Sequence, residues 1–370
     1  MRYYIIAGEA SGDLHGSNLI KAIKANDTNA VIQCWGGDLM QAAGGHLVKH
    51  YSSLAFMGFV EVLMNIRTIL SNIKFCKKDI ETFSPDVLIC IDYPGFNLRI
   101  AKWAKSKGLK VVYFIAPQVW AWKENRVPAM KASIDRLLCI LPFEKQYFKD
   151  RWNWDVDYIG HPLMQVLASQ HDLPHPIPEI AGEKIIALLP GSRKQEIVKK
   201  LPEMLSVVNA FPNYHFAIAQ APGLNDVWFE SLVPANKNIH IVKGNTYALL
   251  NHSVAALVTS GTATLETALL GVPEIVCYKG NPITLALAKR FVKIKFIALV
   301  NLIMDKEVVK ELIQEDLNRK NLVDELSLLL NDGNKKAQIK ADYQILKDKL
   351  YTGQSATEVA ANIIQETIIK

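Results

Sequence analysis

Residues 185–197, IIALLPGSRKQEI, combine a buried strand, a turn and the start of a helix. The five apolar residues predict the strand, and Pro190, Gly191 and Ser192 break it into a turn. Arg193 follows where a polar helix begins. The N-terminus of a helix attracts anions through free N–H groups and its dipole, and the arginine fork fits paired phosphate oxygens. The segment therefore predicts a site for the diphosphate of a nucleotide.

Short apolar runs alternate with helical stretches along the whole chain. This alternation predicts parallel sheets covered by helices, and 370 residues favour two domains. Three prolines within residues 173–178, LPHPIP, predict a stiff linker. We therefore expect an α/β protein with two doubly wound, Rossmann-like parallel-sheet domains at residues 1–172 and 173–345. A helix at residues 346–370 could pack back on the first domain.

Composition excludes several classes of protein. The net charge of +6 is too mild to indicate nucleic-acid binding. Five scattered cysteines with no C-x-x-C spacing argue against a zinc site or a redox pair. Residues 247–265 carry no charge, but they contain too many polar residues for a membrane span. The turn after the first strand lacks the G-x-G-x-x-G fingerprint, which argues against an NAD-dependent oxidoreductase.

Two strand ends in the first half carry polar residues. Glu9 and Ser11 follow the strand expected at residues 2–7, and Asp92 follows the apolar run at residues 86–91. In open α/β sheets the ligand crevice lies outside the carboxyl ends of the strands. Glu9 and Ser11 either line that crevice or serve the turn and the helix cap. Asp92 is either a general base or a turn-capping residue.

A second anion site is predicted at residues 260–273, SGTATLETALLGVP. Ser260, Gly261 and Thr262 open a helix, and Gly271 is placed to end it. Glu266 lies in its first turns, where it either accepts hydrogen bonds from ribose hydroxyls or only complements the helix dipole.

Residues 54–78 form an unusually wide apolar face with basic residues beside it. Such a face either touches lipid or is buried between domains, and the pattern alone favours burial. The residues of the membrane-facing alternative are Phe56, Met57, Phe59, Val60, Leu63, Arg67 and Lys74.

The motifs, in their order and spacing, resemble the lipid-A-disaccharide synthase family of GT-B glycosyltransferases over nearly the whole length. The matching segments are AGEASGD (7–13), MGFVEVL (57–63), IDYPGFN (91–97), PQVWAW (117–122), LPFEK (141–145), GHPL (160–163), LLPGSR (188–193), SGTATLE (260–266), VNLI (300–303) and VKELIQE (309–315).

The resemblance implies an inverting hexosyltransferase of lipopolysaccharide synthesis, without a metal or other cofactor. A 2,3-diacylglucosamine would pass from UDP to the 6-hydroxyl of 2,3-diacylglucosamine 1-phosphate, giving the β-1,6-linked lipid A disaccharide 1-phosphate and UDP. The family's base falls on Asp92 and its nucleotide-binding carboxylate on Glu266. Glu9, Ser11 and Asn301 fall on positions that line the cleft.

The same resemblance implies a cytoplasmic enzyme bound peripherally to the inner membrane, since both substrates carry acyl chains. This favours the lipid-facing alternative for residues 54–78. A homodimer is left open. One departure is Gln165, where many relatives carry an acidic residue, and it puts the hydrogen bonding around His161 in doubt.

Two other functions would fit parts of the pattern. A UDP-N-acetylglucosamine 2-epimerase of the same fold would share the turn at residues 190–193, which we call the phosphate turn, and the helix carrying Glu266. It would not need a wide apolar face. A non-catalytic UDP-sugar-binding protein would not need Asp92.

Overall fold

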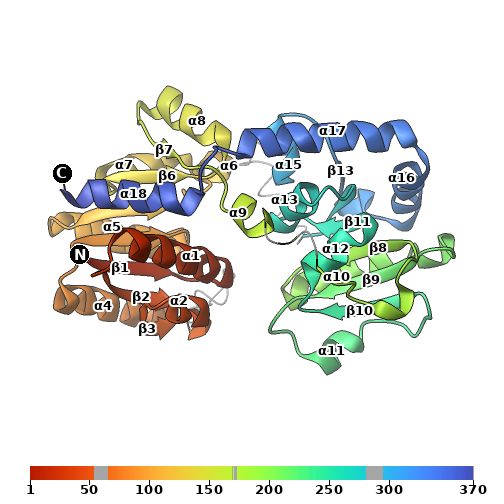
Figure 1. Ribbon diagram of the computed structural model, residues 1–370, viewed down its shortest axis with the longest axis horizontal. Coiled ribbons are helices and arrows are strands. Elements are labelled where there is room, and N and C mark those ends of the chain that lie inside the picture. The colour runs from red at the N-terminus through yellow and green to blue at the C-terminus, as the bar shows by residue number, and fades with distance from the viewer. Residues whose placement is uncertain (54–65, 169, 171–172, 281–294, 370) are drawn as a thin grey trace. The chain divides into compact units, whose positions relative to one another are not determined.

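The computed structural model describes residues 1–53, 66–168, 170, 173–280 and 295–369 (Figure 1). The chain forms two compact units, each with its own parallel sheet. The first unit contains Met1–Pro162 together with Leu350–Lys370, and the second contains Leu163–Lys349. The expected α/β class with two parallel-sheet domains is confirmed.

The first unit holds a seven-stranded sheet in the order β3-β2-β1-β4-β5-β6-β7, and all its strand pairs are parallel. Its strands are β1 (Arg2–Ala7), β2 (Val31–Gly36), β3 (His46–His50), β4 (Val87–Ile91), β5 (Lys110–Phe114), β6 (Arg136–Cys139) and β7 (Asp157–Tyr158). Its helices are α1 (Ala10–Asn26), α2 (Asp38–Ala42), α4 (Ile66–Phe83), α5 (Pro94–Ser106), α6 (Val119–Trp122), α7 (Val127–Ser133), α8 (Pro142–Trp152) and α18 (Ala356–Ile369).

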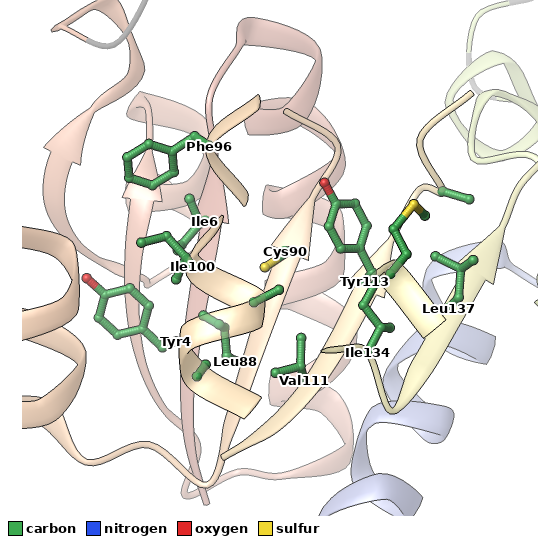
Figure 2. Close-up of a cluster of buried hydrophobic side chains, with 14 of the residues drawn as sticks. Tyr4, Ile6, Leu88, Cys90, Phe96, Ile100, Val111, Tyr113, Ile134 and Leu137 are labelled. Carbon is green, nitrogen blue, oxygen red and sulfur yellow. The ribbon is translucent and has the colours of Figure 1, made fainter. Parts of the chain in front are cut away.

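Both faces of the first sheet are buried, which explains why its central strands are almost continuously apolar. Tyr4, Leu88 and Val111 project from three neighbouring strands to one face, where Phe96 and Ile100 of helix α5 cover them (Figure 2). The opposite face packs against helix α1 and against helix α18 from the other end of the chain. Parallel strands joined by covering helices give this doubly wound arrangement.

The second unit holds a six-stranded sheet in the order β10-β9-β8-β11-β12-β13, again with parallel pairs throughout. Its strands are β8 (Ile185–Leu189), β9 (His215–Gln220), β10 (Ile239–Lys243), β11 (Ser253–Thr259), β12 (Glu274–Tyr278) and β13 (Lys310–Ile313). Its helices are α9 (Leu163–Ala168), α10 (Lys194–Leu205), α11 (Asp226–Glu230), α12 (Thr246–Asn251), α13 (Thr262–Leu269), α15 (Leu299–Met304), α16 (Arg319–Asn331) and α17 (Gly333–Leu350).

The division between the units falls at Pro162, before the proline-rich segment that suggested a boundary at residue 172. Helix α9 belongs to the second unit because it packs against helix α13. The Asn251 side chain also donates a hydrogen bond to the carbonyl of Gln170, which ties the residues after α9 to the same unit. The chain leaves the second unit at Lys349 and ends in the first, where the blue helix α18 lies beside the red helix α1 (Figure 1).

Candidate active site

Apart from Asn301, the polar residues selected from the sequence lie in the turns and helices that follow the strands at which each sheet reverses its order. In the first sheet β1 and β4 are neighbours, with Ala7 opposite Ile91. In the second sheet β8 and β11 are neighbours, with Leu189 opposite Val258. Chain connections leave such a pair in opposite directions, which opens a crevice at the carboxyl ends of the two strands. Each unit therefore presents its candidate residues where ligands bind in sheets of this kind.

Asp92 occupies a strained turn that begins directly after β4. Asp92 has a φ of 40° and Tyr93 a φ of 50°, in the left-handed region that costs a non-glycine residue about 1–3 kcal/mol. Two buried side chains hold this turn through the carbonyl of Asp92. Tyr113 donates its hydroxyl to that oxygen at 2.7 Å, and Asn97 donates its Nδ2 at 2.8 Å. The buried network fixes the direction in which the Asp92 side chain leaves the sheet.

The turn after β1 lies against the turn after β4. A Cβ atom on Gly8 would lie only 2.3 Å from the ring of Tyr93, so only glycine allows this close approach. Glu9 follows as the N-cap residue of α1 and is half-buried. The close packing of Gly8 on Tyr93 brings the polar ends of β1 and β4 together within the first unit.

Glu9 and Asp92 interact electrostatically. Asp92 is exposed to solvent, yet the surrounding protein desolvates its carboxyl and raises the pKa to about 6. The negative charge of Glu9 contributes to this raised pKa, while a hydrogen bond from the backbone of Tyr93 opposes the shift. Asp92 is therefore reachable from solvent and still mostly ionised at neutral pH, as a general base must be.

The segment AGEASGD divides into accessible and structural residues. Ser11 is exposed in the first turn of α1. Asp13 is buried, and its carboxylate accepts hydrogen bonds from the backbone N–H groups of Gly37 at 2.7 Å and Met40 at 3.0 Å. It thereby joins α1 to the first turn of α2. Sequence reasoning assigned Asp13 no role, because the N–H groups that it accepts from belong to a turn and helix far along the chain.

A second pair of segments in the first unit is joined by a buried carboxyl group. Trp120 Nε1 donates to Glu144 Oε1 at 3.0 Å, and the N–H of Leu141 donates to Glu144 Oε2 at the same distance. Burial raises the pKa of Glu144 to about 7, and both hydrogen bonds oppose that shift. The segments PQVWAW and LPFEK are thus held together by their own side chains.

The phosphate turn in the second unit has the predicted form. Gly191 has a φ of +112°, which suits glycine, and Ser192 and Arg193 are exposed. Arg193 is the N-cap residue of α10, and its Nη1 lies 3.4 Å from Oε1 of Glu196 one turn into the helix. Backbone N–H groups and a guanidinium are therefore displayed together at the carboxyl end of β8.

The turn after the neighbouring strand β11 offers a second helix N-terminus. Gly261 and Thr262 are exposed at the start of α13. Farther along, Glu266 Oε1 accepts a hydrogen bond from the hydroxyl of Tyr247 at 2.9 Å. Desolvation raises the pKa of Glu266, and the bond from Tyr247 opposes that effect. Tyr247, which orients this carboxylate, was missed because it comes from the separate helix α12.

Asn301 differs from the other candidates because its polar atoms are used within the protein. It is fully buried in α15. Its Nδ2 donates to the carbonyl of Val309 and to Glu311 Oε1, both at 2.9 Å, and its Oδ1 accepts from the N–H groups of Val308 and Val309. The Glu311 carboxylate also accepts from the N–H of Ala298 at the start of α15. Asn301 thus holds α15 to β13.

Ser260 belongs to the same framework. Its Oγ donates to the carbonyl of Ile297 at 3.1 Å, which joins the turn after β11 to the segment leading into α15. The amide of Asn301 and the carboxylate of Glu311 then hold that segment in place. These polar side chains position the turn that presents Gly261 and Thr262.

The suspected lipid-facing segment is described only from residue 66 onward, so Phe56, Met57, Phe59, Val60 and Leu63 lie outside the described residues. Arg67 and Lys74 are exposed on helix α4. Two large apolar side chains on the same helix are also exposed, Leu70 at 55% and Phe75 at 47%.

Two negative findings apply to the described ranges. None of their helices combines the length and the apolar character needed to cross a membrane. Within the same ranges, no cluster of three or more histidine, cysteine or acidic residues could hold a metal ion.

Two parallel-sheet α/β units with polar residues at their switch points define the GT-B fold of glycosyltransferases. The putative UDP-N-acetylglucosamine 2-epimerase from Listeria monocytogenes has this fold, with a TM-score of 0.71, 13% identity and coverage of 99% of this chain and 96% of that one. The glycotransferase of kitacinnamycin has a TM-score of 0.68, 15% identity and 99% coverage of both chains. At these identities the likeness shows the fold alone.

Sequence similarity is more specific. A family model described as lipid-A-disaccharide synthetase matches residues 3–366. The lipid-A-disaccharide synthase of Syntrophus aciditrophicus is 34% identical over 375 residues, covering 99% of this chain and 97% of that protein. The chain belongs to the lipid-A-disaccharide synthetase family, and it functions as a glycosyltransferase in lipid A biosynthesis. The expected fold and activity class are thereby confirmed, and the likeness to epimerases is one of fold alone.

The hydrogen bond from Tyr113 to Asp92 can be tested by replacing Tyr113 with Phe. We expect the free energy of unfolding to fall by about 1 kcal/mol. If the Asp92 carboxyl takes part in the reaction, turnover should also fall, roughly tenfold, because the turn from which it projects loses one of its hydrogen bonds. Urea unfolding and glycosyl-transfer rates would measure the two effects.

The matched control is Tyr3→Phe. Tyr3 lies near the start of β1, at the end of the strand away from Gly8 and Glu9, and its hydroxyl donates to Asp27 at 3.1 Å. This variant should therefore lose stability with little loss of turnover. Equal turnover in the Tyr113→Phe and Tyr3→Phe variants would show that Tyr113 does not position Asp92.

Proposed function

We propose that this chain transfers 2,3-diacylglucosamine from UDP to the 6-hydroxyl of 2,3-diacylglucosamine 1-phosphate, with Asp92 as the general base. The observation that carries the assignment is the solvent-reachable carboxylate of Asp92, which projects from a backbone turn that two buried hydrogen bonds hold at the switch point of the first sheet. The phosphate turn at Gly191–Arg193, at the switch point of the second sheet, supplies a complementary anion site.

The reaction is a single displacement that inverts the anomeric carbon. The acceptor's 6-oxygen forms the new bond to that carbon while the bond to the UDP oxygen breaks. The hydroxyl proton passes to the Asp92 carboxylate, and the electron pair of the broken bond leaves with UDP. Because the hydroxyl becomes acidic only as the new bond forms, a carboxylate with a pKa of about 6 is a sufficient base.

The departing UDP gains negative charge, and the second unit supplies groups that stabilise it. Gly191, Ser192 and Arg193 would bind the diphosphate, together with the N–H groups of Gly261 and Thr262 at the start of α13. Preorganised N–H groups and a guanidinium lower the barrier because they do not have to reorient during the reaction.

Glu266 would accept hydrogen bonds from the ribose hydroxyls, held in place by its bond from Tyr247. For Ser260 and Asn301 we propose positioning roles, because their side chains make hydrogen bonds to other parts of the second unit. In the first unit, we propose that Glu9 and Ser11 line the acceptor side and that Glu9 also sets the basicity of Asp92.

The acyl chains of both substrates require access to a bilayer. Exposed Leu70 and Phe75 on α4, with Arg67 and Lys74 on the same helix, support contact with an anionic membrane surface. We propose that the enzyme works on the cytoplasmic face of the inner membrane and that residues 56–63 contribute to this contact.

The central test is replacement of Asp92 with Asn. The amide keeps the size of the side chain but cannot take the proton, so turnover should fall roughly a hundredfold or more while UDP binding stays near normal. Mass analysis of the product formed from the two diacylglucosamine substrates would measure turnover, and calorimetry would measure UDP binding.

Three results would contradict this proposal. Normal turnover in Asp92→Asn would remove Asp92 as the base. An epimerised free sugar nucleotide as the product would indicate the isomerase. UDP release that does not depend on the lipid acceptor would exclude the proposed transfer.

The pH dependence of the reaction gives an independent test of Asp92. Since only the ionised carboxylate is a base, kcat/KM should fall as the pH drops below about 6. Replacing Glu9 with Gln removes a negative charge that raises the pKa of Asp92, so this acidic limb should move to lower pH.

Glu81→Gln is the control, because Glu81 is exposed on α4 and pairs with Lys107. Its acidic limb should coincide with that of the wild type. If the acidic limb of Glu9→Gln lies at the same pH as that of the wild type, Glu9 does not influence the pKa of Asp92.

A further inference from the structure

Lys200 is a buried lysine directly behind the phosphate turn. Its side chain is only 2% exposed, although the preceding residue on α10, Lys199, is exposed. Lysine is rarely buried to this extent without a partner or a function. None of the sequence motifs gave Lys200 a role.

The partner of Lys200 is Glu196, which also contacts Arg193. Glu196 Oε2 lies 3.8 Å from Lys200 Nζ, and Glu196 Oε1 lies 3.4 Å from Arg193 Nη1. The same carboxylate is pressed against the turn, since a Cβ atom on Gly191 would lie 2.8 Å from Glu196 Oε2. One carboxylate is therefore shared between a buried ammonium and an exposed guanidinium.

The charged form of Lys200 depends on its pairing with Glu196. Desolvation lowers the pKa of Lys200, and the charge of Glu196 opposes that shift. The ring of Tyr278 lies 6.0 Å from Nζ, at the limit of a cation–π contact. Burial raises the pKa of the nearby Cys277 thiol, which keeps it neutral and leaves Glu196 as the anion paired with this ammonium.

We propose that Lys200 is a positioning residue of the diphosphate site, which holds Glu196 so that Arg193 stays free to bind the diphosphate. This inference rests on the proposed donor site. Arg193 breaks its contact with Glu196 when it binds the diphosphate. If Arg193 were the only cation paired with Glu196, the loss of that contact would make ligand binding less favourable. Lys200 lowers this cost because it remains paired with Glu196 after Arg193 has moved to the ligand.

The proposal predicts a defined pattern in a double-mutant cycle. In Lys200→Met, Glu196 is left with Arg193 as its cation and competes with the ligand, so the Kd for UDP should rise roughly threefold to tenfold. In Glu196→Gln/Lys200→Met the competing carboxylate is gone as well, and the Kd should return to within about twofold of the wild type. Calorimetric titration with UDP measures both values.

Lys199→Met is the matched control, because it removes the same charge from an exposed position on the same helix. A Kd in Lys200→Met equal to that in Lys199→Met would overturn the proposal. So would a double variant that binds UDP no better than Lys200→Met, since the loss would then come from damage to the fold.

Glu196→Gln tests the proposal without emptying the Lys200 site. It frees Arg193, so UDP should bind at least as tightly as to the wild type, and weaker binding would overturn the inference. Arg193→Ala separates this inference from the proposed donor site. If Arg193→Ala leaves UDP binding unchanged, the donor site itself is wrong; if it weakens binding while Lys200→Met does not, only the role of Lys200 fails.

Discussion

The hydrogen bonds to the carbonyl of Asp92 are the constraint on which the proposed chemistry depends. Two consecutive left-handed residues would be unfavourable in an isolated turn, and the buried side chains of Tyr113 and Asn97 compensate for this by donating to one oxygen. Tyr113 belongs to the core that packs α5 on the sheet (Figure 2), and Asn97 is a buried residue of α5 itself. The packing of the first unit thereby fixes the backbone turn from which one carboxylate projects.

The two units use different means to present polar groups at a switch point. The first holds an acidic side chain in a strained turn and raises its pKa by desolvation and by the charge of Glu9. The second displays the N-termini of α10 and α13 after adjacent strands, with Arg193 exposed beside one of them. A base and an anion site are the two functions that an inverting transfer to an alcohol requires.

Much of this arrangement could be predicted from the sequence, because strand, turn and helix signals are local. Pro190, Gly191 and Ser192 predict the phosphate turn from their own backbone preferences. The order of the strands could not be read in this way, since the pairing of β1 with β4 depends on contacts between residues far apart in the chain. The division of the chain at Pro162 is hidden for the same reason, because it depends on the packing of α9 on α13.

Sequence position alone also failed to separate residues that touch solvent from residues that hold the framework. Asn301 matches a cleft-lining position, yet its amide is used by Val308, Val309 and Glu311. Lys200 looks like one more basic residue on a solvated helix, yet its side chain is buried and pairs with Glu196. Such distinctions depend on which face of a helix meets the sheet, and three-dimensional packing decides that.

The account's central claim is that the second unit binds the diphosphate while the first supplies the base. Hydrogen–deuterium exchange at short labelling times, with and without UDP, tests this division of labour directly. UDP alone should protect the backbone N–H groups of residues 191–193 and 261–262 and leave those of residues 8–11 and 92–93 unchanged. Protection of residues 8–11 by UDP, with no change at residues 191–193, would contradict the account.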